Sequence, residues 1–208
     1  MIWALFNDIA QRIITLNKWE QKRNLSEKLK ALNLRPGSKI LDFGCGTGLF
    51  CNVFTKEQFE YYGYDIDERL INYANTLYQN KNCKFTASIE ELTKEAPFEF
   101  ILANCCFHHI DDSTISDVLT EIQNLLDLNG IFLMIDILFA ENDPSILRNL
   151  FRKLEKGPFI RNAEGYRKIV EQHFKVISSI VERSHLFSIK NNIIYNDLLI
   201  LQCKKKLK

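Results

Sequence analysis

The chain has 208 residues, and 46% of them are hydrophobic, which is enough for one domain with a sizeable core. Its 27 Lys and Arg residues balance 26 Asp and Glu residues, so no net positive charge favours nucleic acid or another polyanion. It contains no run of about 18 apolar residues, and we therefore expect neither a membrane span nor a membrane partner.

The six cysteines lie at positions 45, 51, 83, 105, 106 and 203. None belongs to a C-x-x-C pair, so we expect neither a metal site nor a disulfide framework. Reduced thiols in a cytoplasmic protein are the expected state. The apolar start of the chain is interrupted by Asp8 and Arg12 and has no basic leader, which is not the pattern of a signal peptide.

Apolar residues recur at helical spacing through residues 2–33, which predicts one or two helices before the first strand. We expect residues 1–34 to form an N-terminal helical cap on a single domain that spans residues 1–208.

A glycine-rich segment follows the first predicted strand, which covers residues 39–43. Gly44, Gly46 and Gly48 alternate along the chain, and a predicted helix over residues 48–56 comes next. Glycine is needed where the backbone turns sharply or approaches a ligand closely, and free N–H groups at a helix start face that ligand. A nucleotide-type cofactor is therefore expected above this loop.

The glycine spacing indicates which cofactor is less suitable. A dinucleotide fingerprint has a third glycine at position 49 or 51, where this chain has Leu49 or Cys51. The next strand, over residues 61–64, ends in Asp65, whose carboxylate is placed to accept hydrogen bonds from both ribose hydroxyls. A 2′-phosphate would be repelled, so NADP fits poorly.

Strands and helices continue to alternate up to residue 136. Strands are predicted at 84–87, 98–104 and 129–136, and helices at 67–79, 89–95 and 112–128. This order predicts the α/β class with a doubly wound, mostly parallel sheet and a core over residues 35–136. A helical cover over 137–174, broken at Gly157-Pro158, and two final strands at 175–181 and 197–203 within residues 175–208 complete the prediction.

From Asp42 through Gly48, at Asp65, and over residues 98–112 and 129–136, the chain resembles the class I S-adenosylmethionine-dependent methyltransferases, in particular small stand-alone bacterial members. The resemblance implies a Rossmann-like sheet of seven strands whose last strand is antiparallel, with N-terminal helices and a helical insertion before the last two strands. It implies S-adenosyl-L-methionine as cofactor. The residues that it places around this cofactor are Asp42, Gly44, Cys45, Gly46, Gly48, Asp65, Ile66, Ser88, Ile89 and Asn104. The family commonly has an aspartate where this chain has Ser88.

His108 and His109 follow the fourth strand, at the edge of the sheet where ligands bind. Either one is a candidate general base, but alignment of acceptor and methyl group can also supply most of the acceleration. We expect His109, nearer the acidic pair Asp111-Asp112, to be the structural one. Candidates to bind the acceptor are Arg161, Tyr166 and Trp3, although a surface arginine and a packed helix explain Arg161 and Trp3 as well.

The expected function is methyl transfer to a small-molecule acceptor, on oxygen rather than nitrogen. Asn104-Cys105-Cys106 is not the Asn-Pro-Pro-Tyr signature of base and glutamine methyltransferases. Two alternatives stay open, a cofactor-binding subunit without turnover and a protein or peptide methyltransferase. A pocket plugged by Phe107 or Tyr195 would favour the first alternative. We expect a monomer or a homodimer.

Overall fold

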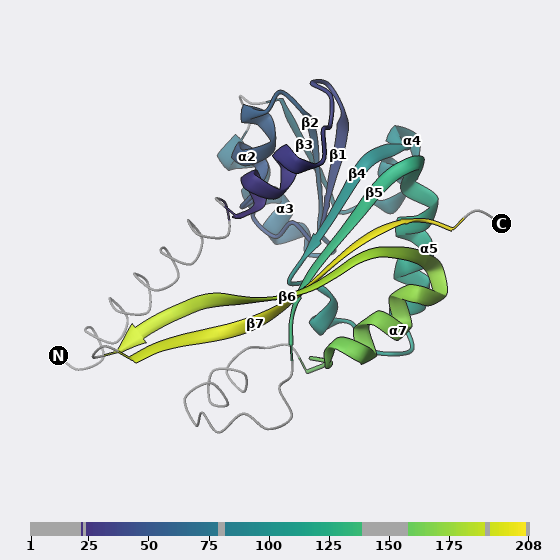
Figure 1. The fold of residues 1–208 in the computed structure, drawn as a ribbon. Helices are drawn as coiled ribbons and strands as arrows, with labels where there is room; N and C mark the ends of the chain where they lie inside the picture. Colours follow the sequence, from purple (N-terminus) through teal and green to yellow (C-terminus); the bar gives the residue numbers. More distant parts are fainter. Residues whose placement is uncertain (1–21, 23, 79–81, 139–157, 190–191, 207–208) are drawn as a thin grey trace.

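The computed structural model describes residues 22, 24–78, 82–138, 158–189 and 192–206. Its centre is a seven-stranded sheet with the strand order β3-β2-β1-β4-β5-β7-β6 (Figure 1). The strands are β1 Lys39–Phe43, β2 Glu60–Tyr64, β3 Cys83–Thr86, β4 Phe98–Asn104, β5 Leu126–Ile137, β6 Phe174–Ile189 and β7 Asn192–Lys205. The predicted fold class is confirmed.

The strand directions gather the site at one edge. β1 to β5 run parallel, and β7 runs antiparallel to both β5 and β6. Phe43 at the end of β1 pairs with Tyr64 of β2 and with Ala103 of β4, so these three strands end level with one another. The loops that follow them therefore meet at the carboxyl edge of the sheet.

Helices cover both faces of the sheet (Figure 1). They are the segment 24–31, α2 Cys51–Lys56, α3 Glu68–Tyr78, α4 Ile89–Glu95, the 3₁₀ turn η1 Phe107–His109, α5 Ile115–Leu125 and α7 Ala163–His173. One core packs segment 24–31, α2 and α3 against the sheet, and the other packs α4, α5 and α7 against its opposite face. Both cores are apolar because the buried parallel strands are apolar on each face.

The helix predictions agree in part with this arrangement. The described part of the predicted N-terminal cap is helical over 24–31, and residues 1–21 lie outside the described residues. The described part of the predicted cover contains the helix α7. Residues 139–157 of the cover lie outside the described residues. None of the described helices is long and apolar enough to cross a bilayer.

The last two strands are much longer than predicted. β7 pairs with β5 only from Leu198 to Cys203, whereas β6 and β7 continue to pair with each other through residues 184–189 and 192–196. This two-stranded ribbon, which we call the arm, projects past the carboxyl edge of the sheet (Figure 1). The polar run Glu182 to His185 does not alternate with apolar residues, so its extended conformation depends on cross-strand pairing that the sequence pattern does not reveal.

Candidate functional site

The three glycines of the loop after β1 differ in what requires them. A Cβ on Gly44 would lie 2.7 Å from the Cβ of Cys106, and one on Gly48 would lie 2.7 Å from a ring carbon of Phe85. These two glycines permit close packing of the loop against its neighbours. Gly46 has a φ of +53° and nothing within 4 Å of its Cβ position, so it borders open space at the carboxyl edge. A ligand can approach the backbone at this point.

Asp65 holds the same loop from the end of β2. Its Oδ2 accepts a hydrogen bond of 2.8 Å from the Gly46 N–H, and its Oδ1 accepts one of 3.0 Å from the Asp67 N–H. Each carboxylate oxygen keeps further acceptor capacity, which suits the hydroxyls of a ribose. Ile66 next to it is 85% exposed, and this offers an apolar surface to a planar ring. The geometry fits a nucleoside held by one acid and one apolar side chain.

Asp42 supports the loop from below. Its side chain is buried, and its Oδ2 accepts a hydrogen bond of 2.7 Å from the Tyr61 hydroxyl. Burial raises the pKa of Asp42 to about 7, and the nearby Asp65 adds to the rise, while the Tyr61 hydrogen bond opposes it. Burial likewise raises the pKa of the Cys45 thiol far above its usual range, so this thiol stays protonated. The cofactor contacts expected of Asp42 and Cys45 remain predictions.

The Ser88 side chain is engaged in capping a helix. Its Oγ accepts a hydrogen bond of 3.3 Å from the Glu91 N–H and donates one of 2.7 Å to Glu90, at the start of α4. Ile89 is half-buried and packs against the core. An open hollow of about 300 Å³ lies beside Ser88 and is also lined by Phe85. Contacts of Ser88 and Ile89 with an adenine ring therefore stay predictions.

The chain turns sharply after β4. Asn104, the last residue of β4, is half-buried, and Cys105 has a φ of +53°. Non-glycine residues in this left-handed region are uncommon and collect at functional sites. The turn is held by the Cys105 N–H, which donates to the Ile135 carbonyl at 2.8 Å, and it places Cys106 against Gly44. Asn104 thus lies beside the glycine loop.

His108 is fixed by a carboxylate that the sequence did not indicate as its partner. Nδ1 of His108 lies 2.6 Å from Oδ1 of Asp136, and Asp136 also accepts hydrogen bonds from the N–H groups of Phe107, His108 and Ile137. His108 and Asp136 are buried, whereas His109 is exposed. Asp136 thus holds His108 in place, and the roles predicted for the two histidines stay predictions. The one available signal for Asp136 was an acid near the end of a buried strand.

Arg161 closes the same loop from the outside. Its five N–H groups donate to the carbonyls of Phe107, Ile110 and Phe159 and, twice, to Asp112 Oδ1, over distances of 2.5–3.2 Å. No donor is left for an acceptor in this conformation. The guanidinium holds the turn that contains His108, and the role of Arg161 in binding the acceptor stays a prediction.

Tyr166 is the second predicted acceptor contact, and this role also stays a prediction. It is fully buried in the core under α7, and its ring lies 5.6 Å from the Arg161 guanidinium carbon. Burial and the nearby Asp136 raise the pKa of Tyr166 above its usual range. Its hydroxyl and the Nε2 of His108 are the two buried side-chain polar atoms without a hydrogen-bond partner among the described residues.

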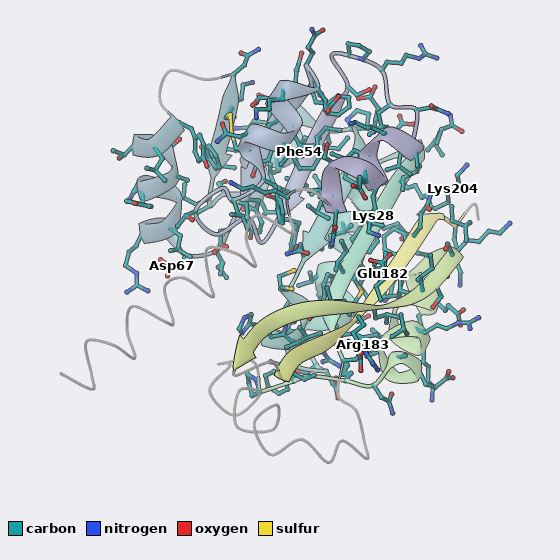
Figure 2. The ribbon with its side chains drawn as sticks, turned by 60° about the vertical axis from the view of Figure 1, so that its left-hand side comes forward. Lys28, Phe54, Asp67, Glu182, Arg183 and Lys204 are labelled. Atoms are coloured by element: carbon teal, nitrogen blue, oxygen red, sulfur yellow. A yellow bond between two sulfur atoms is a disulfide. The ribbon has the colours of Figure 1, made fainter. Side chains whose placement is uncertain are left out.

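A small cavity of about 30 Å³ lies next to Asn104, between segment 24–31, Phe50 before α2 and the strands β4 to β7. Its walls are mainly apolar and include Phe50, and its polar rim contains the ion pair of Lys28 and Glu182, with 2.6 Å between Nζ and Oε1 (Figure 2). A larger cavity of about 780 Å³ lies at the opposite edge of the sheet and is remote from the glycine loop. Trp3 lies outside the described residues, and Phe107 packs in the core against Phe132.

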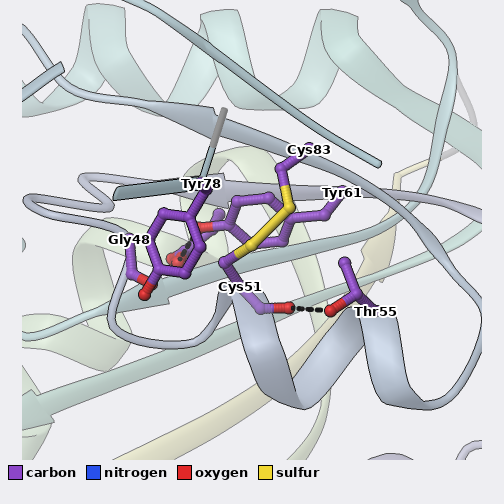
Figure 3. The surroundings of a disulfide bond; sticks show 7 residues. Gly48, Cys51, Thr55, Tyr61, Tyr78 and Cys83 are labelled. Carbon is purple, nitrogen blue, oxygen red and sulfur yellow. Dashed lines mark hydrogen bonds between the residues drawn. A yellow bond between two sulfur atoms is a disulfide. The ribbon is translucent and has the colours of Figure 1, made fainter. Parts of the chain in front are cut away.

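A disulfide joins Cys51 at the start of α2 to Cys83 at the start of β3 (Figure 3). The prediction of reduced thiols is wrong for this pair, because the fold places residues that are 32 positions apart in contact. Beside it, the Tyr78 hydroxyl donates a hydrogen bond of 2.9 Å to the Gly48 carbonyl (Figure 3). Both contacts brace the glycine loop from α3 and β3.

The site therefore combines a doubly wound α/β sheet, an open glycine loop and an acid at the end of β2. A sequence profile of the methyltransferase domain family matches residues 16–179, which is more than half of the chain. The chain belongs to this family and, within it, to the class I S-adenosylmethionine-dependent methyltransferases, whose cofactor is S-adenosylmethionine.

Curated relatives resemble parts of the chain. It is 29% identical over 93 residues to a ubiquinone biosynthesis O-methyltransferase of Bradyrhizobium sp. ORS 278, a match that covers 43% of this chain and 37% of that protein. It is 26% identical over 174 residues to a carboxy-S-adenosyl-L-methionine synthase of Campylobacter concisus, which covers 79% of this chain and 70% of that protein. The chain thus spans less than half the length of some curated relatives that it matches.

Solved structures share the fold. Magnesium protoporphyrin IX methyltransferase of Synechocystis PCC 6803, with bound SAH, aligns with a TM-score of 0.66 and 16% identity over 95% of this chain and 88% of that one. A TehB-like S-adenosylmethionine-dependent methyltransferase of Corynebacterium glutamicum aligns with a TM-score of 0.59 and 18% identity over 98% and 99%. At these identities the likeness concerns the fold alone.

Proposed function

We propose that the protein transfers a methyl group from S-adenosylmethionine to a small-molecule acceptor, on oxygen rather than nitrogen. The observation that carries this proposal is the open backbone at Gly46, held by the Asp65 carboxylate at the carboxyl edge of the sheet. When bound, the cofactor supplies a methyl group on a positively charged sulfur, which is already activated for displacement. The chain has to hold this cofactor and align the acceptor with it.

Alignment rather than proton transfer by His108 is the main contribution we assign to the loop after β4. His108 is 1% exposed, and its Nδ1 is committed to Asp136, so its ring does not meet solvent at the carboxyl edge. Asp136 from inside and Arg161 from outside fix the backbone of this loop. A fixed geometry of the reacting groups can lower the barrier by several kcal/mol, up to about 7–11. His109 is the exposed histidine of the two and the better candidate for a base.

The choice of oxygen as the methylated atom rests on the sequence after β4. The absence of the Asn-Pro-Pro-Tyr signature at Asn104 favours transfer to oxygen. The similarity to a ubiquinone biosynthesis O-methyltransferase is consistent with this choice, although it covers 43% of the chain.

The test is an acceptor screen. The protein is incubated with S-adenosylmethionine and matched sets of phenols, carboxylic acids, amines and peptides, and the demethylated cofactor and methylated products are measured by mass spectrometry. We expect methylated phenols or carboxylic acids, and less product from Gly46→Ala at a limiting cofactor concentration. Product from peptides alone would show a protein methyltransferase. Cofactor binding without turnover on any acceptor would favour the non-catalytic subunit.

A further inference from the structure

β6 is the outer strand of the sheet, and it carries an exposed apolar stretch. Its inner side pairs with β7, and no described residue forms a strand on its outer side. Ile177, Ile180 and Val181 are 43%, 49% and 54% exposed. Ile180 and Val181 are consecutive in a strand and point to opposite faces. Both are exposed, so the described residues leave the two faces of β6 largely uncovered at this point.

This edge lacks charges and proline along its apolar stretch. Outer strands are commonly guarded by charges or proline, because their free N–H and C=O groups otherwise pair with other chains. Residues 176–181, with the sequence VISSIV, contain no charge and no proline. We propose that β6 pairs antiparallel with β6 of a second copy of this chain, across a two-fold axis, to form a homodimer with a continuous sheet.

The sequence of β6 complements itself in such a pair. Residues 175–182 read KVISSIVE, which is nearly the same in both directions apart from a Lys at one end and a Glu at the other. In a two-fold antiparallel pair one residue faces its own copy, and we place Ser179 there. The β-bulge between Val176 and Ser178 adds one residue to each strand. Glu182 then lies opposite Lys175 of the second copy. Val181 lies opposite residues 176 and 177 of the second copy, which share one position because of the bulge.

The same register accounts for the arm. A two-stranded ribbon on its own is marginally stable in water. In the proposed dimer, each arm runs past Phe174 at the start of the other copy's β6. The cavity of about 780 Å³ opens there and is lined by Glu171, Phe174, Lys175 and residues 204–206. The arm of one copy thus packs on the surface of the other copy, at the edge of the sheet that is remote from the glycine loop.

Sedimentation velocity over a dilution series tests the dimer. The wild-type protein should sediment with twice the chain mass of 24.4 kDa. Ser179→Lys places two like charges opposite each other and should weaken dimerisation by about tenfold or more. Leu77→Lys, at a residue that is 50% exposed on α3, is the matched control and should stay dimeric. A wild-type monomer, or a dimer that Ser179→Lys leaves unchanged, would overturn the proposal.

Two further variants test the register. Lys175→Glu should weaken the dimer because it places a like charge opposite Glu182 of the other copy, whose carboxylate also pairs with Lys28 of its own chain. Ser179→Cys should form an intermolecular disulfide under mild oxidation, since opposed Cβ atoms lie about 4.5–5.5 Å apart. Wild-type protein and Leu77→Cys give the background on a non-reducing gel. A dimer unaffected by Lys175→Glu together with an absent Ser179→Cys cross-link would refute this register.

Discussion

Gly46 and Gly37 form a matched pair for testing whether the glycine loop meets the cofactor. Both have positive φ, +53° and +84°, and neither has an atom within 4 Å of its Cβ position. Gly37 lies in the turn before β1, at the opposite end of that strand from Gly46. An alanine at either position therefore carries the same kind of backbone cost and meets no neighbour in the chain.

The expected magnitudes separate folding from binding. A left-handed alanine costs about 1–2 kcal/mol, so both Gly46→Ala and Gly37→Ala should lower Tm by a few degrees. At Gly46 the added methyl group also occupies the open space above the loop. We expect Gly46→Ala to weaken S-adenosylmethionine binding at least about tenfold, which corresponds to about 1.4 kcal/mol, and Gly37→Ala to leave affinity within about twofold.

The assay is isothermal titration calorimetry at a temperature where thermal unfolding shows both variants to be folded. Normal affinity in Gly46→Ala would mean that the ligand does not approach this backbone. Equal loss of affinity in both variants would mean that the effect is one of stability, and the assignment of the site would fail.

Three further predictions concern the supporting residues. Because the folded pKa of Asp42 is raised to about 7, its contribution to stability is present below pH 3.8 and is lost as pH rises toward 7. In urea unfolding, the free energy of unfolding of Asp42→Asn relative to wild type should therefore rise by about 2–4 kcal/mol from pH 4 to pH 8. A difference that does not change with pH would contradict this. His108→Asn should preserve the shape of the pH–rate profile if His108 acts through the loop, and a missing limb would identify it as the base. Thiol titration of denatured, unreduced protein should find the four free thiols of Cys45, Cys105, Cys106 and Cys203, and six would exclude the disulfide.

The arrangement of the glycine loop and Asp65 was predictable because its signals are local. The alternation of strands and helices defined the sheet, and β4 has the predicted bounds, 98–104. The glycine loop follows β1 and Asp65 follows β2, and these two parallel strands end side by side. The Gly46–Asp65 hydrogen bond follows from this arrangement.

The surroundings of His108 were less predictable because they depend on contacts between distant residues. Asp136 reaches His108 from a neighbouring strand, and Arg161 reaches a loop about 50 residues earlier. No local pattern distinguishes a guanidinium that clamps carbonyls from one that binds an acceptor. The length of β6 was missed for a related reason, since the arm is extended by pairing with β7 rather than by its own alternation.

The central claim is that Asp65 and the glycine loop bind S-adenosylmethionine, and the most direct measurement is a calorimetric titration of wild type and Asp65→Ala. Wild-type protein should bind S-adenosylmethionine and its demethylated product, and it should not bind NAD. Asp65→Ala should lose about 1.5–3 kcal/mol of binding free energy, because charge-assisted hydrogen bonds to the ribose are removed. Unchanged affinity in Asp65→Ala, or binding of NAD in place of S-adenosylmethionine, would contradict the account.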